Sequence, residues 1–255
     1  MPVAVTAVCA LFGLAVGSFL NVVIWRVPRH ESIVHPPSHC PSCDTPIRPY
    51  DNIPVVSWLL LRGRCRDCGA GIAPRYPLVE AGTALAFGMV GARFDLTWAL
   101  PGYLVFTAGI IALSVIDLDT FLLPNRIVYP LAVVSIPLVG LAAAGDGGWS
   151  AFGRALAGGA ALFGLLLVIH LISPRGMGFG DVKLAFILGI WTGYLGWGEV
   201  IVGIFWSFAA GAVIGVGLMV FSGRGRKDPV PFGPFLALGS FAAVIFGRAF
   251  LDWYL

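Results

Sequence analysis

Gly176-Met177-Gly178-Phe179-Gly180-Asp181-Val182-Lys183 places a carboxylate and an amine at the start of an apolar run, residues 182–197. A charged side chain at the edge of a membrane-spanning segment is energetically expensive, so such a group is interpreted first as functional. The glycines lack Cβ atoms, which lets the backbone turn sharply and lets another segment approach closely. The alternative is structural: a glycine-rich loop in which Asp181 caps a helix or pairs with Lys183.

The composition of the whole chain indicates a membrane protein. Of 255 residues, 58% are hydrophobic and 11% are charged, which is far from the usage of soluble globular domains. Lipid offers no hydrogen-bond partners, so each apolar run is expected to be a helix. The predicted fold class is an all-α integral membrane protein with about eight transmembrane helices. The eight apolar runs are residues 3–25, 78–92, 101–116, 127–144, 152–172, 182–197, 200–221 and 234–251.

One long polar segment, rich in proline and arginine, interrupts the apolar runs. We therefore predict a first transmembrane helix at 1–27, a polar loop at 28–77 and a seven-helix membrane region at 78–255. With the N-terminus outside, thirteen of the sixteen Lys and Arg residues fall on the inner side, as the positive-inside rule requires. This orientation predicts that both termini lie outside and that the polar loop is cytoplasmic.

Four of the five cysteines lie in the polar loop as two pairs, Cys40-Pro-Ser-Cys43 and Cys65-Arg-Asp-Cys68, separated by twenty-one residues. Cytoplasmic thiols stay reduced, so disulfides are not expected there. Two C-x-x-C pairs at this spacing predict a tetrahedral four-cysteine zinc site. Four thiolates leave no open coordination position, so the zinc is expected to be structural and to supply folding free energy to a small polar loop.

A second carboxylate changes the interpretation of the glycine-rich stretch. Asp117 ends the run 101–116 and, in the predicted topology, lies at the same membrane face as Asp181. Two close carboxylates in a low dielectric share one proton, so one can activate water while the other donates to a carbonyl oxygen. The pattern predicts an aspartyl dyad that cleaves a peptide at the membrane interface. Asp119 is the alternative to Asp117, and a salt bridge from Asp117 to Arg126 is the structural alternative.

Five motifs follow one another in order within residues 13–185. They are GSFLNVVIWRVP at 17–28, the two C-x-x-C pairs, YPLVE at 76–80, Ile116-Asp117 with Leu123-Pro124-Asn125, and GFGDVK at 178–183. Together they resemble the bacterial type IV prepilin peptidases, which are GxGD aspartyl proteases. The one departure is Asn125, where aspartate is common in that family.

The resemblance implies an enzyme that removes the short basic leader of type IV prepilins and pseudopilins. Cleavage would follow a glycine at the cytoplasmic face of the bacterial inner membrane. By motif position the resemblance assigns cleavage to Asp117 and Asp181, with Gly178, Gly180 and Lys183 in support. Many members also methylate the new N-terminal residue with S-adenosylmethionine, and the cysteine loop is usually associated with that bifunctional form. The implied partners are prepilin substrates and membrane lipid, with no nucleic acid.

Three polar, family-matched residues, Asn21, Arg26 and Glu80, are candidates either for methyl transfer or for anchoring the loop to the helices. His170, near the end of the run 152–172, is interpreted as a buried hydrogen-bonding residue rather than a ligand. Two other functions stay open from the residues alone. One is a GxGD protease that cuts other membrane segments, and the other is a non-enzymatic polytopic scaffold or transporter.

Overall fold

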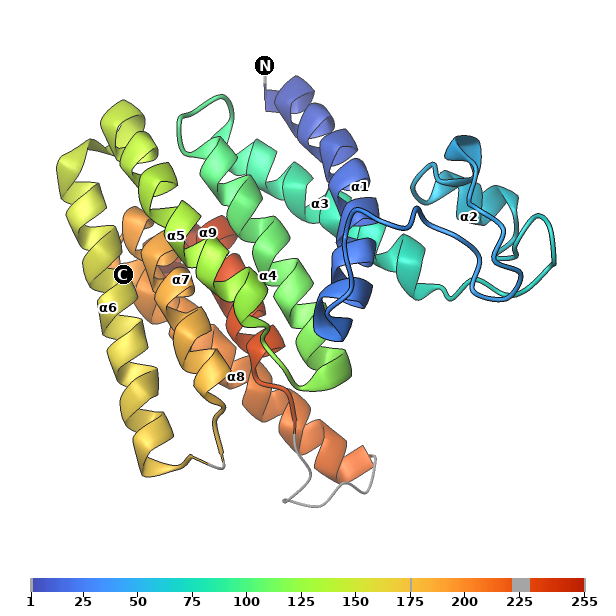
Figure 1. The fold of residues 1–255 in the computed structure, drawn as a ribbon. Helices are drawn as coiled ribbons and strands as arrows, with labels where there is room; N and C mark the ends of the chain where they lie inside the picture. The colour runs from blue at the N-terminus through green and yellow to red at the C-terminus, as the bar shows by residue number, and fades with distance from the viewer. Residues whose placement is uncertain (1, 175, 222–229, 255) are drawn as a thin grey trace. The chain divides into compact units, whose positions relative to one another are not determined.

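A computed structural model describes residues 2–174, 176–221 and 230–254 (Figure 1). Four residues counted on the inner side lie outside the described residues: Arg175, Arg224, Arg226 and Lys227. The described part of the chain is mainly helical and contains two isolated β-bridges but no strand. It divides into two compact units, Met1–Asp95 and Leu96–Leu255.

The helices follow the predicted apolar runs closely. The first unit contains α1 (Pro2–Arg26), η1 (Val27–Arg29), η2 (Pro49–Asp51), α2 (Val56–Leu60) and α3 (Arg75–Phe94). The second contains α4 (Leu100–Thr120), α5 (Asn125–Ala142), the π-helical turn η3 (Ala143–Gly147), α6 (Gly148–Ile172), α7 (Phe179–Leu195), α8 (Trp197–Phe221) and α9 (Gly233–Tyr254). The all-α membrane class is confirmed.

The number of spans differs from the prediction. Six helical segments among the described residues are long and apolar enough to cross a membrane, rather than about eight. The two predicted spans outside this set are α3, which carries charged side chains such as Glu80, and α7, which has 17 residues. Most of α7 between Asp181 and Tyr194 is buried, because it packs against other helices and needs little contact with lipid.

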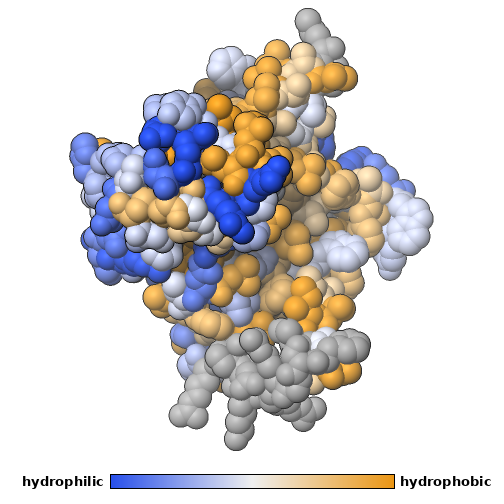
Figure 2. Space-filling view, turned by 90° about the vertical axis from the view of Figure 1, so that its right-hand side faces the viewer, coloured by the Kyte–Doolittle hydropathy of each residue, from blue (hydrophilic) through white to orange (hydrophobic). Residues whose placement is uncertain are grey.

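In the first unit, α1 packs along α3 through small residues. A Cβ atom on Gly17 would lie 2.7 Å from the Cα atom of Glu80, so the two backbones approach more closely than larger residues would allow. The segment 27–74 carries most of this unit's polar side chains. The face shown in Figure 2 has a gathering of hydrophilic residues beside broad hydrophobic areas, as expected for a chain with a polar loop and lipid-facing helices.

In the second unit, α7 packs against α5, α6, α8 and α9. It crosses α6 at glycines, since a Cβ atom on Gly158 would lie 2.6 Å from the carbonyl oxygen of Gly189. The buried Trp191 of α7 donates from its indole nitrogen to the Ser135 hydroxyl of α5, at 3.0 Å. Its carbonyl accepts a hydrogen bond of 2.8 Å from the Tyr103 hydroxyl of α4. These contacts fix the helix that carries Asp181.

Candidate aspartyl active site and metal centre

Asp117 lies in the last turn of α4 and Asp181 in the first turn of α7, and both are buried although they are ionisable, with 5% and 7% of their surface exposed. Gly180, the residue before Asp181, and Gly233 both lie against Leu123. The amide of Gly233, the first residue of α9, donates to Asp117 Oδ2 at 3.0 Å. Residues far apart in the sequence, from α4, α7 and α9, therefore meet at one buried site.

Leu123, in the short link between α4 and α5, fills the space beside both aspartates. A Cβ atom on Gly180 would lie 3.1 Å from Leu123 Cβ, and one on Gly233 would lie 3.4 Å from Leu123 Cδ2. The same Cβ on Gly233 would lie only 2.7 Å from Asp117 Oδ2. The two glycines thus leave room for Leu123 and for the Asp117 carboxylate.

The structural alternatives for the two aspartates do not hold. Gly178, not Asp181, is the N-cap residue of α7. Lys183 donates to Asn125 Oδ1 and lies over the Tyr129 ring, 5.3 Å from its centroid. Within the ranges that the structure describes, no ion pair joins Asp117 to Arg126. Asp119 is exposed at the end of α4, which distinguishes it from the buried Asp117.

Two features of this site are absent from the sequence prediction. Gly233 lies in Pro231-Phe-Gly-Pro234, which is a turn pattern. This stretch lies outside the five family motifs. The contact of Gly233 with Asp117 arises only from the packing of α9. The sequence also did not predict that Lys183 donates a hydrogen bond to Asn125. Asn125 is the one position that departs from the family pattern.

The four loop cysteines come together in two turns of similar form. In the first turn the Cys40 amide donates to the Thr45 carbonyl at 3.0 Å, and in the second the Cys65 amide donates to the Ala70 carbonyl at 2.8 Å. The residue after the second cysteine of each pair has a positive φ, 55° at Asp44 and 72° at Gly69. That conformation turns the chain back after each pair.

The sulfur positions fit a tetrahedral metal ion. All four Sγ atoms lie within 4.8 Å of one another, and Cys40 Sγ and Cys68 Sγ are 3.8 Å apart. Zinc–sulfur bonds of about 2.3 Å in a tetrahedron require sulfur–sulfur distances of about 3.8 Å. The Thr45 hydrogen bonds lower the pKa of the Cys43 thiol to about 7, whereas desolvation and the neighbouring thiols raise the pKa of Cys68 to about 12.

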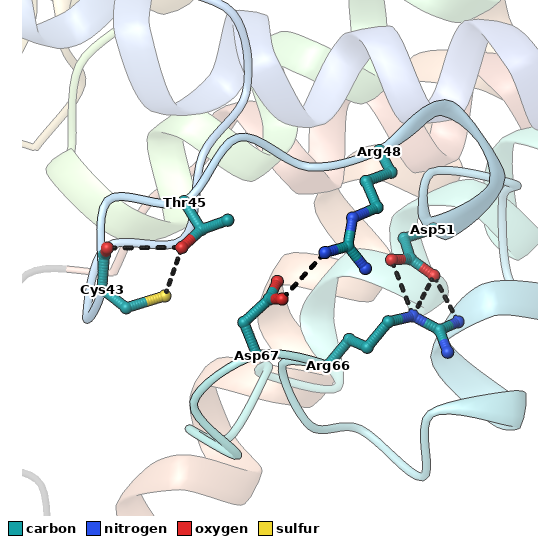
Figure 3. Close-up of polar contacts among 6 residues, drawn as sticks. All are labelled: Cys43, Thr45, Arg48, Asp51, Arg66 and Asp67. Atoms are coloured by element: carbon teal, nitrogen blue, oxygen red, sulfur yellow. Dashed lines mark hydrogen bonds and ion pairs between the residues drawn. The ribbon is translucent and has the colours of Figure 1, made fainter.

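Two ion pairs connect the cysteine turns independently of any metal (Figure 3). Arg48, after the first turn, binds Asp67 of the second at 3.0 Å. Arg66 binds both carboxylate oxygens of Asp51, and this hydrogen bonding lowers the pKa of the Asp51 carboxyl group. Paired Arg–carboxylate geometry of this kind orients the two turns toward each other.

The three polar candidates Asn21, Arg26 and Glu80 all bind backbone atoms of their own unit. Asn21 Nδ2 donates to the Tyr76 carbonyl at 3.1 Å. The Arg26 guanidinium donates to the carbonyls of Ser32 and Pro36 at 2.9 and 2.7 Å. Each of these contacts ties α1 either to the start of α3 or to the polar segment that follows α1.

Glu80 binds an unusual backbone turn. Its Oε2 accepts the Val55 amide at 2.7 Å. Val55 has φ 61° and ψ −49°, and the Val56 amide closes a tight turn onto the Pro54 carbonyl at 2.6 Å. A β-branched residue rarely adopts positive φ, because its side chain clashes with the backbone. The carboxylate of α3 thus holds a strained point of the polar loop.

Two family models match the chain. Residues 11–94 match the bacterial peptidase A24 N-terminal domain, and residues 104–216 match the type IV leader peptidase family. These ranges contain the cysteine loop and both aspartates, respectively. Gly233 lies beyond the second match.

Several curated proteins are similar over most of their length, and all three below are called prepilin leader peptidase/N-methyltransferase. The protein of Aeromonas hydrophila is 38% identical, covering 96% of this chain and 92% of its own. That of Pseudomonas aeruginosa is 36% identical, covering 100% and 94%. That of Bacillus subtilis is 34% identical, covering 96% of both. No solved structure matches.

Proposed function

This chain belongs to the type IV leader peptidase family, and from that premise we propose that it removes the leader of type IV prepilins and pseudopilins and methylates the new N-terminal residue. The observation that carries the proposal is that two buried carboxylates, Asp117 and Asp181, lie at the ends of two helices with Leu123 beside both ends. Cleavage would follow a glycine at the cytoplasmic face of the bacterial inner membrane.

The two aspartates cleave by activating water. The Gly233 N–H donates a hydrogen bond to Oδ2 of Asp117. The proton that the two carboxyl groups share therefore lies on Asp117 Oδ1 or on Asp181. The ionised carboxylate takes a proton from water, whose oxygen attacks the scissile carbonyl carbon. The protonated carboxyl group donates to the carbonyl oxygen. The tetrahedral intermediate then breaks its C–N bond. The carboxyl group that took the proton from water gives it to the leaving nitrogen, and the hydroxyl group of the intermediate returns its proton to the other carboxylate as the carbonyl forms again.

The supporting residues act through packing. Gly180 and Gly233 leave space for Leu123 and for the carboxylate. Lys183 stays clear of Asp181 because it binds Asn125 and two aromatic rings, Tyr129 and Phe179. Lys183 follows Asp181 by two residues in α7, and the dyad carries one net negative charge when one proton is shared.

The four-cysteine site would hold a structural zinc ion in the cytoplasm. The spacing, the sulfur distances and the cytoplasmic side predicted from the positive charges support this assignment. Zinc there fixes the fold of the loop and does not act on substrate, because four cysteine ligands complete its coordination.

S-adenosylmethionine would supply the methyl group. We propose that Asn21, Arg26 and Glu80 anchor the polar loop, because each of them binds its unit's backbone. These hydrogen bonds do not form a binding site for a nucleoside, so no step of methyl transfer is assigned to these three side chains.

The experiment is mass spectrometry of a model prepilin incubated with the purified full-length protein, with and without S-adenosylmethionine. Loss of the leader in both samples, with one added methyl group only when the donor is present, is the expected result. Cleavage without methylation would remove the transferase half of the proposal. An intact cognate substrate, with a folded enzyme, would refute the peptidase half.

A further inference from the structure

One side chain outside the dyad reaches the loop that precedes the second aspartate. His170 is half-buried in the last turn of α6, two residues before that helix ends. Its Nδ1 atom lies 2.8 Å from the carbonyl oxygen of Met177. A carbonyl oxygen only accepts hydrogen bonds, so Nδ1 carries the hydrogen and donates it. The imidazole therefore joins the end of α6 to the loop.

The bonded carbonyl lies directly before the start of α7. Met177 is buried, and the next residue, Gly178, is the N-cap of the helix. The Asp181 amide donates to the Gly178 carbonyl at 3.1 Å, and Asp181 Oδ2 lies 3.4 Å from where a Gly178 Cβ atom would be. The Met177–Gly178 peptide thus lies directly beside the Asp181 carboxyl group.

The same imidazole contacts the residue on the other side of Gly178. The rings of His170 and Phe179 have centroids 5.6 Å apart, at an interplanar angle of 53°. Phe179 also lies under the ammonium group of Lys183, which is 5.5 Å from the ring centroid. His170 therefore holds the first turn of α7 through one hydrogen bond and one ring contact.

The other hydrogen bonds of the described residues at the end of α6 are local. The Gly176 amide donates to the Ser173 carbonyl at 3.0 Å, and the Ser173 amide donates to the Ile169 carbonyl at 2.9 Å. Both continue the end of α6 and neither reaches Met177 or Gly178. Among the described residues, the His170 side chain supplies the link between α6 and the peptide beside the N-cap.

We propose that His170 is a positioning residue for the second catalytic aspartate. Its Nδ1–H fixes the Met177–Gly178 peptide and so keeps Asp181 in register with Asp117. The proposal rests on the peptidase function above. Misplacing a catalytic group by about 1 Å lowers the rate on the order of 100-fold. The loss should appear in kcat rather than in KM, because the imidazole acts on Asp181 and not on the substrate.

Two variants separate the hydrogen bond from the ring contact. His170→Phe keeps a ring against Phe179 and loses the donor. His170→Asn loses the ring and places its amide nitrogen close to the position of Nδ1. Each full-length variant is purified in detergent and assayed for kcat and KM on a model prepilin, with the wild type as the positive and Asp181→Asn as the negative control.

The expected result is a fall in kcat of at least 10-fold in His170→Phe, with KM within two-fold of the wild type. In His170→Asn, kcat should stay within three-fold of the wild type. Wild-type kcat in the Phe variant, or an equal loss in both variants, would overturn the proposal. An inactive wild type would instead count against the peptidase function.

A second readout does not depend on substrate. Hydrogen–deuterium exchange of the peptide covering residues 176–185 reports the opening of the first turn of α7. Exchange should be faster in His170→Phe and unchanged in His170→Asn. Equal exchange in the wild type and the Phe variant would overturn the positioning role even if no variant cleaved the substrate tested.

Discussion

Replacing Gly233 by alanine tests whether α9 completes the active site. The added Cβ atom would lie 2.7 Å from Asp117 Oδ2. Ordinary contact needs about 3.4 Å, so the carboxylate or the start of α9 must move by about 0.7 Å. The 3.0 Å hydrogen bond from the Gly233 amide would then be lost or weakened. A hydrogen bond to a charged group contributes about 1.5–3 kcal/mol.

We therefore expect Gly233→Ala to lower kcat/KM for a model prepilin on the order of 100-fold, since 1.4 kcal/mol corresponds to about ten-fold. The helix itself should tolerate the change, because alanine is a better helix former than glycine. The matched control is Gly164→Ala in α6, where a Cβ atom meets nothing within 4 Å. That variant should cleave at the wild-type rate.

The result that would refute this reasoning is a folded Gly233→Ala enzyme that cleaves within three-fold of the wild type. It would mean that the carboxylate relaxes without cost, and that Gly233 does not orient Asp117. Thermal unfolding of both glycine variants, monitored by circular dichroism, separates a catalytic defect from loss of the fold.

Three further predictions concern the dyad, the metal and the loop. Asp117→Asn and Asp181→Asn should each reduce cleavage on the order of 10⁴-fold while elution on size-exclusion chromatography stays unchanged; cleavage by either variant at a wild-type rate would contradict the dyad. Cys40→Ser and Cys68→Ser should lose zinc in elemental analysis and impair methylation more than cleavage, and a wild-type protein without metal would contradict that assignment. Glu80→Leu leaves a loop amide without its acceptor and should destabilise the protein by about 1–3 kcal/mol, whereas Glu80→Gln, which keeps an acceptor oxygen, should be close to wild type in thermal unfolding.

Much of the fold follows from local sequence alone. A long apolar run without hydrogen-bond partners in lipid has to be a helix, so the runs near 101–116 and 152–172 became α4 and α6 with small changes at their ends. The cysteine site was also predictable from the sequence, because each C-x-x-C pair forms its own turn. The two turns then need only one contact with each other. The number of membrane spans was harder to predict from the sequence. Other helices bury α7, so the thickness of the lipid does not set its length.

The candidate site was predictable in part. Asp117 and Asp181 were identified because carboxylates at the ends of apolar runs are costly, and because the predicted topology places them at one face. The choice of Asp117 over Asp119 agrees with the burial of the first and the exposure of the second. Residue type and position alone left Asp119 as an alternative, and the family resemblance assigned cleavage to Asp117 and Asp181 by motif position.

The sequence by itself thus determined the membrane class, the order of the helices and the four-cysteine cluster, because each depends on local hydrophobicity or on spacing. It predicted the aspartate pair, which stays a prediction. Only the tertiary structure decided that Gly233 donates to Asp117 and that His170 holds the loop before Asp181. It also decided that Lys183 binds Asn125. These contacts join residues from separate helices, and which helix faces meet depends on the packing of the whole unit.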